Sequence, residues 1–250
     1  MTEFRDWYKS IPFFTRHWLT FTLVLSIITR FGAINYRYLV LDYYSFIYRF
    51  QIWRGFTALF FYPIGPSTGF HFLINCYFLY NYSQRLETST FAGKPADYFY
   101  MLLFNWACCL IIGLLVNLSI LMDAMVLSVL YVWCQLNKEV IVNFWFGSRF
   151  KAMYLPWVLF AFNLIINGGG VMELLGILIG HVAFFLLFQY PQEFGGPALL
   201  TPPPFLKQIF PDTRYVGGFG SAPQAQAPTR PAGPTFGGHN WGRGQALGGN

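Results

Sequence analysis

Uncharged apolar runs alternate with shorter polar connections from the N-terminal arm to about residue 190. A helix needs about 20 mostly apolar residues to cross a bilayer. The first run is short and reaches this length only by continuing past Arg30, whose long side chain can snorkel to the surface. We predict an all-α membrane protein whose six transmembrane helices are His17–Ile34, Ser67–Gln84, Tyr98–Met122, Ala124–Asn137, Ala152–Met172 and Leu174–Gln192.

Helix-breaking residues set some of these limits. Pro63 and Pro66 break the first part of the uncharged stretch Gly55–Gln84, so we place the start of the second helix near Ser67. The third and fourth helices divide near Asn117–Asp123. Three consecutive glycines, at positions 168–170, predict a turn between the last two helices.

The first connection is long and rich in aromatic residues, with Arg37, Arg49 and Arg54 among them. This mixture is typical of an amphipathic structure that lies in the membrane interface. Within it, Arg54 follows Trp53, and the pair could clamp the loop to the body through a stacked guanidinium and carbonyl or phosphate contacts. The pair could equally anchor the loop in the interface, and the two roles are compatible.

The distribution of basic residues predicts the orientation. The third and fifth connections contain no Lys or Arg, whereas the N-terminal arm, the second and fourth connections and the C-terminal region all do. By the positive-inside rule both termini are expected in the cytosol. The four arginines near the first connection, which include Arg30, oppose this assignment unless that loop lies in the interface.

Composition supports a membrane-embedded body. Hydrophobic residues make up 55% of the chain and charged residues 10%, against about 25% charged residues in ordinary soluble domains. The four cysteines fall within predicted helices, so no disulfide framework is expected. Nothing in the sequence predicts a metal, a cofactor or a nucleic-acid partner.

After residue 190 the composition changes to Pro, Gly, Ala and Gln. We therefore expect a six-helix membrane domain over residues 1–190 and a largely disordered cytosolic tail over 191–250. Leu199–Phe210 could form a short surface-bound element. Near the end, Trp241 and Leu247 could offer two apolar anchors to a groove on a partner, with flexible glycines between them.

Several phrases spread along the chain resemble the rhomboid superfamily and, more specifically, its derlin branch of pseudoproteases. They are Phe50-Gln51-Ile52-Trp53-Arg54, Phe78-Leu79-Tyr80, Arg85-Leu86-Glu87, Leu130-Tyr131-Val132-Trp133, Leu155-Pro156-Trp157-Val158 and Gly180-His181. The resemblance implies a rhomboid-like bundle. The tail is similar to the motif by which derlins hold the valosin-containing AAA ATPase, and its matching residues are Trp241, Gly242, Gly244, Gln245 and Leu247.

The derlin resemblance also implies a function and partners. Derlins act in the endoplasmic reticulum membrane, where they help misfolded proteins return to the cytosol for ubiquitination and degradation. The expected partners are misfolded proteins, the AAA ATPase, a membrane ubiquitin ligase complex and the bilayer, in a homo- or hetero-oligomer. A short first helix, the proline break and polar residues such as Asn105 and Asn163 would make the bundle locally thin and polar, which lowers the cost of moving polar chain through lipid.

No catalytic residue is expected. An active rhomboid needs a serine in a G-x-S-G frame on the fourth helix and a histidine base on the sixth. Here Val126 and Val129 occupy the positions of the frame's two glycines around Ser128, and Glu173 stands where the histidine would be. An intramembrane serine protease and a small-molecule transporter remain alternatives. The first lacks its nucleophile frame, and the second lacks duplicated halves with matched broken helices.

Four residues could line a polar cavity: His71, Asn75, Glu173 and His181. His71 and Asn75 match the H-x-x-x-N pattern of the rhomboid second helix, yet as an i,i+4 pair they could simply bond to each other. Glu173 could face a cavity or sit hydrated at the lumenal helix end. Gly176 and Gly180 form G-x-x-x-G, which allows close packing against the fourth helix or, alternatively, an oligomer contact.

Overall fold

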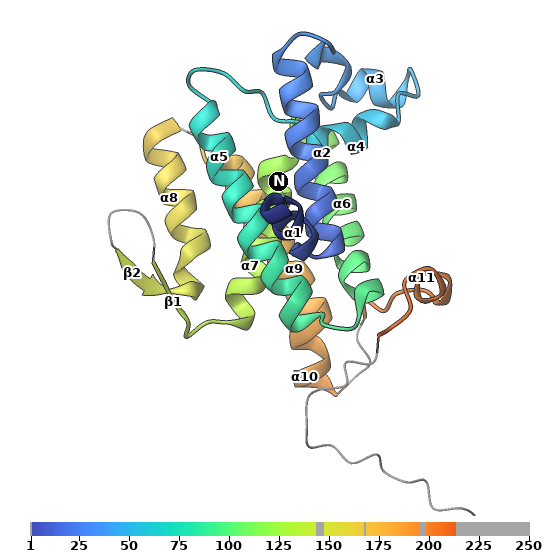
Figure 1. The fold of residues 1–250 in the computed structure, drawn as a ribbon, viewed down its shortest axis with the longest axis vertical. Helices are drawn as coiled ribbons and strands as arrows, with labels where there is room; N and C mark the ends of the chain where they lie inside the picture. The colour runs from blue at the N-terminus through green and yellow to red at the C-terminus, as the bar shows by residue number, and fades with distance from the viewer. Residues whose placement is uncertain (1, 144–147, 168, 196–198, 214–250) are drawn as a thin grey trace, which may run out of the picture. The chain divides into compact units, whose positions relative to one another are not determined.

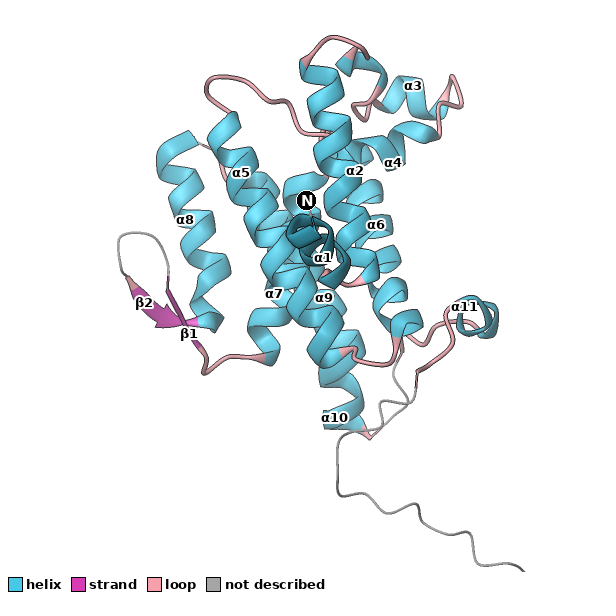
Figure 2. Cartoon of the chain, viewed as in Figure 1, coloured by secondary structure: helices cyan, strands magenta, loops and turns pink. Residues whose placement is uncertain are grey.

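The computed structural model describes residues 2–213 apart from 144–147, 168 and 196–198. Figures 1 and 2 show a bundle of roughly parallel and antiparallel helices with one small hairpin at its edge. The described residues belong to one compact unit. The all-α class expected from the sequence is confirmed, since the strands in the described ranges are three residues each.

The helices of the N-terminal half are α1 (Thr2–Ser10), α2 (Phe13–Arg30), α3 (Tyr43–Ile47), α4 (Trp53–Phe60) and α5 (Gly69–Phe78), with a short 3-10 turn at Tyr36–Tyr38. Helix α5 continues through π-helical turns at Leu79–Ser83 and Leu86–Thr90. The C-terminal half contains α6 (Pro95–Val116), α7 (Met122–Leu136), β1 (Ile141–Asn143), β2 (Arg149–Lys151), a 3-10 turn (Ala152–Tyr154), α8 (Leu155–Asn167), α9 (Val171–Phe184), a π-helical turn (Phe185–Gln189), α10 (Tyr190–Phe194) and α11 (Pro204–Ile209).

Each of the six apolar runs contains a helix, namely α2, α5, α6, α7, α8 and α9. Two continuous helices, Pro95–Val116 and Val171–Phe194, are long and apolar enough to cross a membrane by themselves. The bent pair Glu3–Ser10 and Phe13–Arg30 passes the same test when taken together. Met122–Leu136 and Ala152–Ile165 are apolar but shorter. The number of membrane crossings therefore stays a prediction.

Helix α7 forms the centre of the bundle (Figure 1), and the residues from Ala124 to Cys134 are all buried. A helix that is apolar on every face can be stable only when other helices surround it. Its most extensive partner is α9. A side-chain carbon added at Gly176 would lie 2.7 Å from the Ala124 carbonyl oxygen, and one added at Gly180 would lie 2.7 Å from the Ser128 oxygen. The glycine pair thus lets two helices of the same chain approach closely.

The observed helix limits differ from the predicted ones where local geometry decides. The first long helix starts at Phe13 rather than His17, because Pro12 ends a bend of 116° between α1 and α2. Helix α5 starts at Gly69, close to the expected Ser67, but continues to Thr90 through its π-helical turns. The β1–β2 hairpin was not expected. Its strands pair antiparallel, with Val142 opposite Phe150.

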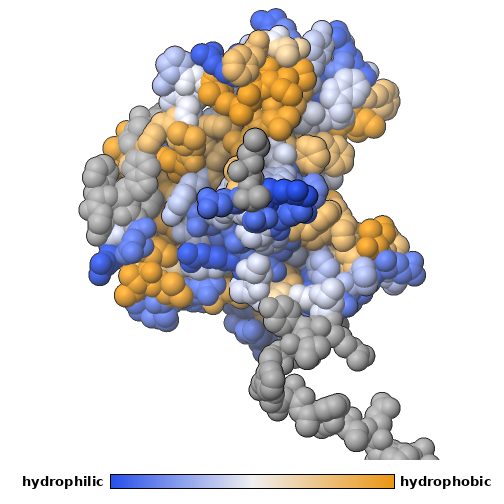
Figure 3. Space-filling model, viewed as in Figure 1, coloured by the Kyte–Doolittle hydropathy of each residue, from blue (hydrophilic) through white to orange (hydrophobic). Residues whose placement is uncertain are grey.

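Apolar residues remain on the surface over large areas of the face in Figure 3. Many are the aromatic side chains of the first connection, which are more than half exposed: Tyr36, Tyr38, Tyr44, Tyr48, Phe50 and Trp53. Others lie on the outer sides of the long helices, such as Leu115 and Ile165. Such a surface is costly in water and favourable in lipid, which agrees with a membrane protein.

Candidate functional site

Polar side chains from four helices meet at one end of the bundle. Helix α5 contributes His71 and Asn75, and the first turn of α7 contributes Asp123. Asn163 comes from α8, and Glu173 comes from the first turn of α9. We call these five residues the polar cluster. Pro63 and Pro66 precede α5, and Gly169 and Gly170 precede α9, so that both helices start at the same end of the bundle as α7.

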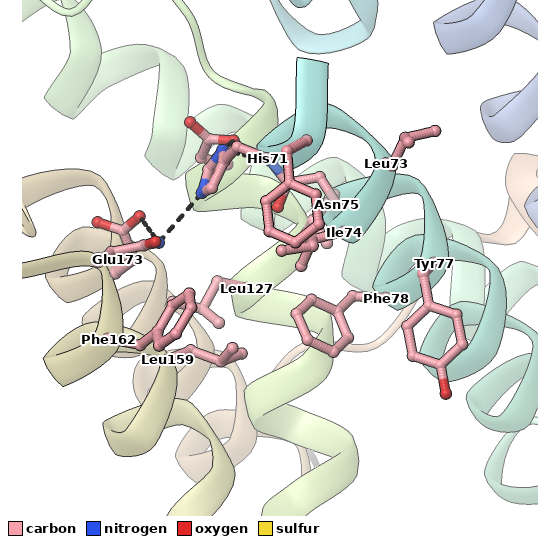
Figure 4. A pocket seen from close by; sticks show the side chains of 14 residues that line it. His71, Leu73, Ile74, Asn75, Tyr77, Phe78, Leu127, Leu159, Phe162 and Glu173 are labelled. Carbon is pink, nitrogen blue, oxygen red and sulfur yellow. Dashed lines mark hydrogen bonds and ion pairs between the residues drawn. The ribbon is translucent and has the colours of Figure 1, made fainter. Parts of the chain in front are cut away.

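His71 is the centre of the polar cluster (Figure 4). Its Nδ1 lies 2.7 Å from the Tyr62 hydroxyl, and its Nε2 lies 3.1 Å from Asn163 Nδ2. The Asn163 amide also donates to a carboxylate oxygen of Glu173 at 2.5 Å. When Asn163 donates to Nε2, the proton of a neutral His71 lies on Nδ1, where the Tyr62 oxygen can accept it. The ring is therefore held from both sides.

Asn75 joins the polar cluster to α7. Its amide donates to the Asp123 carboxylate and lies 3.2 Å from His71 Nδ1. His71 and Asn75 thus touch, but their main partners are Tyr62, Asn163 and Asp123 rather than each other. The interpretation that His71 and Asn75 bond only to each other as an i,i+4 pair is therefore incomplete.

The polar cluster contains more acidic than basic side chains. It holds two carboxylates, on Asp123 and Glu173, and the Asp123 carboxylate lies 3.9 Å from His71 Nδ1. No Lys or Arg is among the described residues that line the two adjoining cavities. Glu173 belongs to the first turn of α9 but is buried, so it lines the cavities and does not lie hydrated at the helix end. Its carboxylate accepts the hydrogen bond from the Asn163 amide.

Two cavities meet at the polar cluster. One, of about 310 Å³, lies between α5 and α8, with α7 behind it (Figure 4). Apart from the cluster its walls are apolar, and its outer α5 side chains Phe70, Leu73 and Tyr77 are each more than half exposed. The other, of about 410 Å³, lies between the residues before α5 and the turn before α9. The polar cluster is thus reached both from the apolar side of the bundle and from its end.

This arrangement is suited to binding a polar group. Among the described residues, no group of three or more His, Cys, Asp or Glu is close enough to hold a metal ion. The Ser128 hydroxyl is buried and donates to the Met125 carbonyl oxygen of its own helix. Amide, imidazole and carboxylate groups beside an apolar cavity can instead accommodate a polar group that enters from lipid.

The structure brings three of the four candidate cavity residues together and leaves the fourth apart. His181 is exposed, and its ring lies 2.9 Å from the Tyr131 hydroxyl. It stands eight positions after Glu173 on one helix, which is about 12 Å along the axis. Asp123 and Tyr62 were not among the candidates. The isolated charge of Asp123 between two apolar runs could have indicated it, whereas nothing near Tyr62 in the sequence could.

Arg54 clamps the first connection to itself. Its guanidinium donates to the carbonyl oxygens of Arg37 at 2.6 Å and Val40 at 2.8 Å, and to the Gln51 side chain at 2.6 Å. Arg54 is buried, whereas the neighbouring Trp53 is about half exposed (51%). The carbonyl contacts expected of the pair thus belong to the arginine, and the tryptophan is free to face the surroundings.

The partner-binding residues expected in the tail, Trp241, Gly242, Gly244, Gln245 and Leu247, lie outside the described residues.

Comparison with known proteins shows the family to which the chain belongs. A model of the Der1-like family matches residues 11–204. The chain belongs to the Der1-like family. Derlin-1 of Homo sapiens is 50% identical over 249 residues, which cover 99% of both chains. Derlin-1 of Drosophila melanogaster is 49% identical over 245 residues, 98% of each chain, and that of Caenorhabditis elegans is 44% identical over 252 residues, 99% of this chain and 100% of that one.

Proposed function

We propose that this chain is a non-catalytic component of endoplasmic reticulum-associated degradation that helps misfolded proteins return to the cytosol. The observation that carries the proposal is the extent of the similarity to derlin-1 proteins, since it covers 99% of both chains for the human relative. The aligned region therefore includes both the polar cluster and the tail. Family membership rests on many positions, so it does not depend on one motif.

The geometry of the polar cluster is compatible with this role. A misfolded membrane segment exposes polar groups that are costly in hydrocarbon. The cavity between α5 and α8 offers such a segment apolar walls for its lipid-facing residues and amide, imidazole and carboxylate groups for its polar ones. The adjoining cavity at the end of the bundle continues from the polar cluster. We infer that the substrate enters between α5 and α8.

We further propose that the tail recruits the valosin-containing AAA ATPase and that the body joins a membrane ubiquitin ligase complex as part of an oligomer. Both termini would then lie in the cytosol, with six helices in the endoplasmic reticulum membrane. The support is the tail sequence with its two apolar anchors and the absence of Lys and Arg from the third and fifth connections. The ATPase supplies the pulling force that a passive bundle lacks.

A protease role has less support. Ser128 bonds within its own helix, and the described histidines have other partners: His17 the Phe13 carbonyl oxygen, His71 Tyr62 and Asn163, and His181 Tyr131. A serine nucleophile needs a base within hydrogen-bonding reach. We therefore propose that the rhomboid-like scaffold works here without peptidase chemistry.

Replacing the tail anchors tests the proposed function. Trp241→Ala and Leu247→Ala should each weaken ATPase capture by detergent-solubilised full-length chain, because losing a buried anchor costs about 2 kcal/mol, roughly thirtyfold in affinity. Both variants should also slow degradation of a misfolded membrane protein in cells that depend on this chain. Phe236→Ala, an aromatic change in the tail outside the motif, is the matched control. Undiminished capture and degradation after deletion of residues 241–250 would refute the recruitment role.

A further inference from the structure

The chain does not leave the body at the end of α10. It returns to the side of the bundle beside the start of α6, where α11 lies (Figure 1). Leu206 of α11 is only 3% exposed. The ring of Phe210 contacts three aromatic rings, with centroid distances of 5.1 Å to Phe14, 5.4 Å to Phe99 and 6.2 Å to Phe13. Residues far apart in the sequence thus form one aromatic docking surface.

A backbone hydrogen bond also holds the docked segment at its C-terminal end. The Thr213 amide donates to the Gly93 carbonyl oxygen at 3.0 Å. Gly93 has a φ of +75°, and a side-chain carbon at this position would lie 2.4 Å from the Thr213 oxygen. The contact therefore requires glycine both for its backbone conformation and for its closeness.

The docking surface lies on a junction of three segments. The backbone amides of Phe14 and Thr15 donate to the Glu87 carboxylate, each at 2.9 Å, so that Glu87 caps the start of α2. Buried hydroxyls continue the junction, with Thr15 and Ser83 2.7 Å apart and Ser83 and Tyr98 2.7 Å apart. Phe14 therefore belongs to the capped start of α2, and its ring also packs against the docked Phe210.

Only one side of α11 is held. Phe205 and Ile209 are 59% and 62% exposed, and the outward apolar side of α11 is visible in Figure 3. A helix of six residues is marginal by itself, so its order depends on docking. Contacts of Leu200, Leu206 and Phe210 and one backbone hydrogen bond can hold such a segment and can also release it.

We propose that residues 199–213 are a releasable clasp that sets where the cytosolic tail begins. With the clasp docked, the tail starts beside Gly93. When it is released, the tail starts after α10 and gains residues 195–213, about 60 Å of extended chain. Because the clasp lies between the tail and α9, a pull on the tail opens it before it loads α9. The clasp rests on the proposed function in two respects, namely that the tail is cytosolic and that the ATPase is the source of the pull.

Hydrogen exchange on full-length chain in lipid nanodiscs, without ATPase, tests the docking. The amides of Phe210 and Thr213 should be protected, and Phe210→Ala should speed their exchange at least about tenfold. Phe205→Ala, a change of the same kind on the outward side of α11, should leave it unchanged. Gly93→Ala should act like Phe210→Ala without removing any side chain of the clasp. Exchange at the rate of an unstructured peptide in the unaltered chain would overturn the proposal.

Mechanical pulling tests the release independently of any partner. A nanodisc-embedded chain held at its N-terminus and pulled at its C-terminus should lengthen first in one low-force step, which releases a contour length of up to about 60 Å. Phe210→Ala should abolish the step, and Phe205→Ala should keep it. A first step that is identical in unaltered chain and Phe210→Ala would refute the clasp. Loss of ATPase capture by tail variants, with this step retained, would refute the recruitment role alone.

Discussion

Arg54 fixes the position of the first connection through hydrogen bonds to backbone carbonyls. Arg54 is 6% exposed, and its guanidinium donates to acceptors on three other residues. The Thr57 hydroxyl adds a bond to the Leu39 carbonyl oxygen at 2.8 Å. Carbonyls in a non-helical loop near lipid need such partners, since an unsatisfied buried acceptor is costly. The planar fork of arginine supplies several of these bonds at once.

Arg54→Ala should therefore destabilise the first connection by about 1–3 kcal/mol, the cost of leaving buried acceptors unpaired. Arg54→Lys should recover only part of this, because an ammonium lacks the fork. Faster proteolysis within residues 36–52 and a lower Tm in detergent would register the loss. The control is Arg49→Ala, since Arg49 is exposed and lies over the Tyr44 ring at 5.6 Å. Equal stability of Arg54→Ala and Arg49→Ala would contradict the clamp.

Ser128 gives the second prediction at this scale. Its hydroxyl already has an acceptor in the Met125 carbonyl, 2.8 Å away. Ser128→Ala should therefore lower stability by no more than about 1 kcal/mol and leave degradation of a misfolded membrane substrate unchanged. Turnover of such a substrate in cells and a purified cleavage assay would both report on this. Cleavage that disappears in Ser128→Ala would show that the chain is a protease.

At the scale of elements, the pairing of α7 with α9 organises the bundle. Two glycines one turn apart remove the side chains that would separate the helices, so backbone meets backbone. Association in lipid gains little from the hydrophobic effect and depends on this close packing. The same pairing brings the first turns of α7 and α9, and with them Asp123 and Glu173, to one end.

Gly180→Ala should push α9 away from α7. The added carbon would meet the Ser128 carbonyl oxygen at 2.7 Å and Tyr131 Cβ at 2.8 Å, and overpacking of this kind costs about 1–3 kcal/mol. We expect a lower Tm in detergent. Gly69→Ala is the matched control, because a carbon added there meets nothing within 4 Å. Similar Tm values for the two variants would mean that the α7–α9 contact yields more easily than its geometry indicates.

For the whole molecule, the predicted topology places both termini on one side of the membrane. A reporter tag within residues 117–123 should be inaccessible from the cytosol, whereas tags at the C-terminus and in the hairpin connection between β1 and β2 should be accessible. The reason is the distribution of Lys and Arg among the connections. Protease protection in intact microsomes measures it. Tags at 117–123 and at the C-terminus on the same side would remove the six-crossing topology.

Derlin membership and the helical nature of the body followed from the sequence, because hydrophobic runs, prolines and glycines act locally. Pro63 and Pro66 precede α5 as expected, and Gly169 and Gly170 lie between α8 and α9. The C-terminal boundary of the body was harder to predict from the sequence. The compact unit extends past residue 190 to include α11, because Phe210 finds its partners on α2 and α6, which no local pattern in the tail reveals.

The polar cluster depended on tertiary structure. The sequence determined that His71, Asn75 and Glu173 are polar residues in apolar surroundings, where each needs a partner. It did not determine the partners, since Asn75 meets Asp123 across 48 positions and His71 meets Asn163 across 92. Only the packing of α5, α7, α8 and α9 decides which polar groups meet and which, like His181, stay apart. Hydrophobicity is a property of a segment, whereas a hydrogen bond depends on the relative placement of two segments.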